Sequence, residues 1–91
     1  MRESSLVKGV VGQSLHSAKE LGLDVGQTAV ESVNGAVDAV QKTGGDVSEA
    51  TKTAVMTAVD TAKDVGEDAV ATVKSALAAG VNGAEDILKS L

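Results

Sequence analysis

Gly44-Gly45-Asp46 belongs to a Gly-x-Asp series that recurs every 22 residues, its other members being Gly22-Leu23-Asp24 and Gly66-Glu67-Asp68. Apolar residues follow the same step, and the first of their columns contains Val11, Val33, Val55 and Leu77. A second column contains Leu15, Val37, Val59 and Val81, and a third contains Ala18, Val40, Ala62 and Ala84. Several columns in one register indicate a repeated supersecondary unit.

The length of the repeat indicates helices, because 22 is twice 11 and 11 residues make about three helical turns. On a wheel of 11 positions the apolar columns span an arc of roughly 130°, the width expected of a helix that faces a core. Apolar residues in the segment 33–40 recur in steps of three and four, whereas a strand would need steps of two. The sequence therefore predicts an all-α protein.

The composition predicts that these helices depend on packing. The chain has 91 residues and no aromatic side chain, and its 15 Val, 7 Thr and 10 Gly are weak helix formers. Each costs several tenths to about 1 kcal/mol relative to Ala. A chain of this length buries only about 60 to 65% of its unfolded surface. We expect modest stability or dependence on self-association.

The composition also argues against several kinds of site and function. The absence of cysteine excludes disulfides and thiolate metal sites. No apolar run is long enough to span a membrane, and the amino terminus lacks a signal peptide's apolar region, so we expect a cytoplasmic protein. A net charge of −5 with eight basic residues argues against binding of nucleic acid.

The Gly-x-Asp tripeptides are interpreted as the end of one helix and the start of the next. Glycine suits the left-handed residue that closes a helix, and aspartate two positions later can accept hydrogen bonds from the next helix's first amides. A capping box is predicted where Asp46 precedes Glu49 and where Asp24 precedes Gln27. Ala71 follows Asp68 in the third case, so no box forms there.

These junctions, near 22–24, 44–46 and 66–68, predict one repeat-built domain over residues 1–91. It is an up-down bundle of four antiparallel helices, expected near 5–21, 25–43, 47–65 and 69–90, because short links favour antiparallel neighbours. Asn34-Gly35 and Asn82-Gly83 fall inside two of these ranges and mark sites for kinks or earlier breaks.

One long, interrupted amphipathic helix is the alternative, because an 11-residue repeat keeps its phase on a single helix. The doubled Gly44-Gly45 and the junction aspartates favour the bundle, since both disrupt a continuous helix. In the bundle we expect a buried set, Val55, Val59, Ala62 and Leu77. We expect an exposed set, Glu31, Asp38, Asp60 and Asp64.

Five lysines share one position of the wheel beside the apolar arc: Lys8, Lys19, Lys52, Lys63 and Lys74. We call them the lysine column. In an ordinary bundle such lysines flank a seam and pair weakly with acids three or four residues away. At a lipid surface they would lay their methylenes on the apolar face and keep their ammonium groups in water. The bundle flank is favoured, because the arc has no Trp or Phe and the chain is acidic.

No residue pattern predicts catalysis, a cofactor or a metal site. His16 is the only histidine, in a column with Asp38, Asp60 and Asn82 that we expect to face solvent. The paired acids Glu67-Asp68 and Glu85-Asp86 would need a desolvated pocket to act as acid and base. Gly9-Val10-Val11-Gly12 lacks the ending and the preceding strand of a phosphate loop, and is interpreted as small residues permitting helix contact.

The segment 51–63, Thr-Lys-Thr-Ala-Val-Met-Thr-Ala-Val-Asp-Thr-Ala-Lys, resembles the 11- and 22-residue amphipathic repeats of synucleins, perilipins, apolipoproteins and late-embryogenesis-abundant proteins. The helical, Val- and Ala-rich composition is similar to that of bacterial phasins. The resemblance extends over most of residues 6–91. It implies reversible helix formation on lipid or on partner surfaces.

From these patterns we expect a non-enzymatic helical interaction or self-assembly module. Its expected partner is another copy of the chain or another helical protein, bound through the Val/Ala stripe. The alternative is an amphipathic coat of a lipid or granule surface, or a stress-protective protein.

Overall fold

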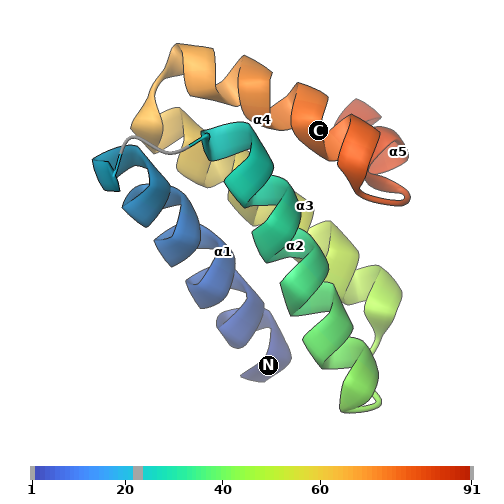
Figure 1. Ribbon diagram of the computed structural model, residues 1–91. Helices are drawn as coiled ribbons and strands as arrows, with labels where there is room; N and C mark the ends of the chain where they lie inside the picture. Colours follow the sequence, from blue (N-terminus) through green and yellow to red (C-terminus); the bar gives the residue numbers. More distant parts are fainter. Residues whose placement is uncertain (1, 22–23, 91) are drawn as a thin grey trace.

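A computed structural model describes residues 2–21 and 24–90, with side chains described from Val7 onward (Figure 1). Over these residues the chain is all-α and contains five helices and no strand. Their bounds are Arg2–Leu21 for α1, Val25–Lys42 for α2, Val47–Val65 for α3, Glu67–Gly80 for α4 and Ala84–Lys89 for α5. The helical bundle predicted from the repeat is confirmed, and a single continuous helix is not the structure found.

Helices α1, α2 and α3 run alternately up and down beside one another (Figure 1). Each of the three contacts the other two. Helix α4 crosses obliquely over α2 and α3, and α5 folds back against α3 and α4. Within the described residues α1 contacts neither α4 nor α5. One side of α1 is therefore left without a neighbouring helix.

The repeat columns form the core. Val11, Val33, Val55 and Leu77 are each 0% exposed, which confirms the first column in full. The second and third columns are buried too, except for Val37, which is partly buried. The residues expected to be exposed, Glu31, Asp38, Asp60 and Asp64, all face solvent. The phase of the wheel is therefore correct on each of the helices from α1 to α4.

The middle junction has the predicted left-handed glycine and the predicted aspartate cap, but the described hydrogen bonds do not include the one from the Asp46 amide to the Glu49 side chain that would complete a capping box. Gly44 has a φ of 79°, and the amides of Gly44 and Gly45 donate to the carbonyls of Gln41 and Val40. This pattern is a Schellman motif, which satisfies carbonyls at the end of a helix and favours glycine at the left-handed position. Asp46 then caps α3, because its carboxylate accepts a hydrogen bond of 3.1 Å from the amide of Glu49.

The first junction has the same cap, since the Asp24 carboxylate accepts from the Gln27 amide at 3.1 Å. The predicted stop at Gly22 lies outside the described residues. At the third junction the prediction is partly wrong. Gly66 ends α3, but it is also the only residue between α3 and α4, and Asp68 lies inside the first turn of α4 without capping it.

The helix expected over 69–90 is two helices. The chain leaves α4 at Gly80, passes through Val81-Asn82-Gly83 and begins α5 at Ala84. Val81 and Ala84 are buried on either side of this break. The turn brings Ile87 and Leu88 of α5 against the core, which one straight helix would carry away from it. Asn34-Gly35, in contrast, lies within the unbroken helix α2.

Two glycines bring α2 and α4 together. A Cβ atom on Gly80 would lie 2.8 Å from Val30 Cγ1, and one on Gly26 would lie 3.0 Å from Thr72 Cγ2. The Asn34 side-chain amide donates to the Gly80 carbonyl at 3.3 Å. Sequence reasoning placed the close helix contact at Gly9–Gly12 instead. A Cβ atom added at Gly9 would meet nothing within 4 Å, and one added at Gly12 would lie at an ordinary contact distance of 3.6 Å from Thr61 Oγ1.

Replacing Asp46, the residue that caps α3, tests the junction between α2 and α3. Asp46→Ala should lower the free energy of unfolding by about 0.5 to 2 kcal/mol, because a helix amide loses its partner. Asp68→Ala is the matched control and should cost less, since Asp68 accepts no capping bond. Urea denaturation followed by circular dichroism measures both. Equal losses would show that Asp46 has no special role at the start of α3.

A pair of Gly→Ala substitutions tests the crossing of α2 and α4. Gly80→Ala should destabilise the fold, because the new methyl group overlaps Val30 in a packed contact, and overpacking typically costs about 1 to 3 kcal/mol. Gly35→Ala, at an open site inside α2, should instead stabilise by about 0.5 to 1 kcal/mol through helix propensity. Thermal melts that show stabilisation by both variants would contradict the close approach.

Candidate functional site

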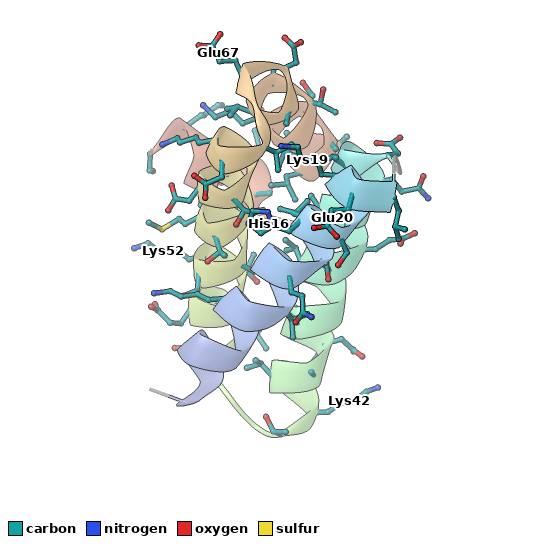
Figure 2. The ribbon with its side chains drawn as sticks, turned by 90° about the vertical axis from the view of Figure 1, so that its left-hand side faces the viewer. His16, Lys19, Glu20, Lys42, Lys52 and Glu67 are labelled. Atoms are coloured by element: carbon teal, nitrogen blue, oxygen red, sulfur yellow. The ribbon has the colours of Figure 1, made fainter. Side chains whose placement is uncertain are left out.

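His16 and the acid pairs Glu67-Asp68 and Glu85-Asp86 lie on three different helices and are exposed. His16 lies on the exposed surface of α1, one helical turn before Lys19 and Glu20 (Figure 2). Asp38, Asp60 and Asn82, which share its column, are exposed as well. Among the described residues no group of three or more His, Cys, Asp or Glu side chains could hold a metal ion.

The two acid pairs lie in the first turns of short or medium helices. Glu67 and Asp68 begin α4, and Glu85 and Asp86 follow the first residue of α5. All four side chains are exposed. A pair of carboxylates needs burial to divide the acid and base roles between them, and this arrangement does not provide it.

The lysine column is divided among three helices. Lys8 and Lys19 lie on α1, Lys52 and Lys63 on α3, and Lys74 on α4, and all five are exposed. On α1 the two lysines flank Gly12, on the side that meets Thr61 of α3. Lys63 lies 3.7 Å from Asp60, three residues earlier. Such an exposed pair contributes little to stability.

The segment Gly9–Gly12 is part of the continuous helix α1. Its backbone amides are therefore engaged in helical hydrogen bonds and do not form a loop that could cradle a phosphate.

An uncharged surface runs along the open side of α1 and the adjoining edge of α2. Val10, Ser14, Ser17 and Leu21 follow one another at helical spacing on α1, and Thr28, Gly35 and Ala39 do so on α2. We call these seven residues together with Gln13 the α1–α2 face. A depression of about 450 Å³ in this face is lined by Val10, Gln13, Ser14, Ser17, Ala18 and Thr28.

This face carries two of the most exposed large apolar side chains, Val10 at 41% and Leu21 at 73%. No residue of the face is charged, although charged residues make up 23% of the chain. Three further depressions on the described surface each include Lys52 or Glu85. The absence of charge therefore distinguishes the α1–α2 face from these other hollows.

The exposure of Val10 and Leu21 follows from the position of α1. These two residues are 11 apart, and the same column contains Ser32 and Ala54, which are buried on α2 and α3. Helix α1 has no third neighbour among the described helices to cover the column. Sequence reasoning missed this face, although the large apolar side chains of Val10 and Leu21 in one column were a usable signal.

A second apolar surface lies between α3 and α5. Two open depressions of about 420 and 410 Å³ share Lys52 and Ile87, and they include Val47 and Met56 respectively. Val47 and Met56 are each 38% exposed. Lys52 and Asp86 place opposite charges in this surface, so it is less suited to a dry contact than the α1–α2 face.

No protein-family model matches the chain, and comparison with curated proteins and with solved structures gives no significant match. None of the helices described is long and apolar enough to cross a bilayer.

Proposed function

We propose that this chain is a non-enzymatic helical module that associates with a second copy of itself through the α1–α2 face. The observation that carries the proposal is the uncharged strip with Val10 and Leu21 exposed, on the side of α1 that no other described helix covers. Surfaces depleted of charge and containing apolar side chains are typical of the centre of a protein interface.

The composition of the face suits helix-to-helix contact. Ser14, Ser17, Gly35 and Ala39 have small side chains, so a facing helix can approach to the short end of the usual range of about 8 to 10 Å. Val10 and Leu21 are 11 residues apart on α1, so they provide an apolar contact near each end of the strip.

The small size of the α1–α2 face limits the strength of the expected contact. The described chain measures 34 × 26 × 19 Å along its principal axes, and the face occupies one side of it. The eight residues of the face are fewer than the roughly 20 to 30 residues a side of a standard interface, so the association is expected to be weak and transient. A second copy related by a twofold axis would bury the same patch on both chains. We therefore expect a dimer that forms at micromolar concentrations or above.

A charge placed at the exposed Leu21, near one end of the strip, tests this proposal. Leu21→Lys should reduce dimerisation by at least about tenfold, because an unpaired charge would have to be buried where apolar surface is buried in the wild type. The side chain is already 73% exposed, so the fold of one chain should be unaffected. Met56→Lys adds the same charge on another surface and is the matched control. Sedimentation velocity over a range of concentrations measures both variants.

A compact monomer at every concentration would overturn the proposal. So would a dimer that Leu21→Lys and Met56→Lys weaken to the same extent, because the contact would then not involve the α1–α2 face.

The lysine column supports a second proposal, a coat on an anionic lipid or granule surface. All five of its lysines are exposed and belong to helix positions beside the apolar arc. In the closed bundle that arc is buried, so binding through it would require the helices to separate. Self-association through a surface that is already exposed requires no separation of the helices, and we therefore favour it over the coat.

Vesicle binding tests the coat function. Anionic vesicles should bind the chain at low ionic strength and release it when salt is added, because each interfacial lysine contributes about 1 kcal/mol and is screened. The triple variant Lys52→Glu, Lys63→Glu and Lys74→Glu should not bind, while its circular dichroism in buffer stays helical. Flotation of the wild type without any bound fraction at low salt would exclude the coat.

A further inference from the structure

The junction between α3 and α4 differs from the other two junctions. Gly66 is its only residue, with φ 155° and ψ 162°, and α4 has no side-chain cap. At the other junctions Asp24 and Asp46 accept hydrogen bonds from the amides of the next helix. Straightening the chain at Gly66 would therefore break no capping bond, whereas straightening it at Asp24 or Asp46 would break one.

Helical hydrogen bonds already reach Gly66 from both sides. Its amide donates to the Ala62 carbonyl at 2.9 Å, and its own carbonyl accepts from the Val70 amide at 3.3 Å. If Gly66 became helical, the amides of residues 67–69 would meet the carbonyls of residues 63–65 in the usual i to i−4 pattern. Helices α3 and α4 would then form one helix from Val47 to Gly80.

The repeat keeps such a helix amphipathic. Gly66 is 11 residues from both Val55 and Leu77, so all three share one column of the wheel. An 11-residue repeat stays in phase along a straight helix, and the buried residues of α3 and α4 would therefore lie on one face. The cost of straightening is the loss of the contacts that α4 and α5 make with α2 and α3 of the same chain.

A second copy of the chain offers those contacts again. Val73 and Leu77 of α4 are fully buried in the closed chain, and Gly26 and Val30 of α2 form the surface that receives α4. Two straightened chains present identical arms and identical vacated surfaces. Exchange of an identical element between two chains restores the native contacts away from the hinge and is a low-cost route to a dimer.

We propose that Gly66 is a hinge about which α4 and α5 swing out as one arm, and that two copies of the chain exchange these arms. The inference rests on the proposed function in one respect, namely that the partner is a second copy. It does not use the α1–α2 face, so the two modes of association can be separated by experiment.

A pair of introduced thiols reports exchange directly. An ideal Cβ atom at Gly80 lies 3.5 Å from Val30 Cβ, which is within the range of disulfides, and the chain has no cysteine of its own. Val30→Cys combined with Gly80→Cys therefore gives a disulfide within one chain in the closed monomer and between two chains after exchange.

The double variant is held reduced at micromolar to millimolar concentrations, oxidised, denatured and run on a non-reducing gel. We expect covalent dimers whose fraction rises with protein concentration. Gly66→Ala in the same background should raise the dimer-to-monomer ratio by at least about tenfold, because alanine favours the helical conformation at two positions per dimer. Gly9→Ala improves helix propensity at an open site inside α1 that is not part of the α1–α2 face, and it should leave the ratio unchanged.

Disulfides confined to single chains at all concentrations, with and without Gly66→Ala, would overturn the exchange. If sedimentation nevertheless shows a dimer that Leu21→Lys disrupts, the proposed face-to-face association stands without the exchange. Covalent dimers that persist with Leu21→Lys would support an exchange that is independent of the α1–α2 face.

Discussion

Close packing of small side chains around α2 holds the structure together. Helix α2 contacts α1, α3 and α4, and its buried side consists of Gly, Ala, Ser and Val residues. Without aromatic rings the chain cannot fill wide spaces between helices, so the helices must approach closely. Gly26 and Gly80 mark the tightest point, where an added methyl group would overlap α4 or α2. The positions of α4 and α5 depend on this contact.

Periodicity predicted the helices and their buried sides because both are set by local spacing. The column Val11, Val33, Val55 and Leu77 is fully buried, and the Gly44 and Asp46 signals mark a real helix end and a real helix start. The break at Asn82-Gly83 could not be distinguished from the unbroken Asn34-Gly35 by local signals. Tertiary contacts determine that the helix breaks at Asn82-Gly83, since Ile87 and Leu88 reach the core only after a turn. Asp68 resembles the two capping aspartates in sequence, but the single-residue link at Gly66 places it inside α4.

The α1–α2 face was not predicted because its exposure depends on the number of neighbours that each helix has. The column of Val10 and Leu21 is buried at Ser32 and Ala54, where helices flank it, and open on α1, where one side has no described neighbour. The proposed exchange also depends on neighbours. Helix α4 has no side-chain cap at Gly66, and an arm that swings out there needs the identical surface of a second chain. Both features underlie our proposals of self-association, through a face in one case and an exchanged arm in the other.

The most direct test of the packing around α2 is nuclear magnetic resonance of the chain at low concentration. We expect helical Cα chemical shifts that are interrupted at Gly44, Gly45 and Asp46, together with nuclear Overhauser contacts between the Val30 methyl groups and the Gly80 Hα atoms. These contacts require α4 to lie across α2 at the distance that glycine alone permits. Unbroken helical shifts through Gly44 and Gly45, with no contact between Val30 and Gly80, would contradict the bundle and favour one long helix.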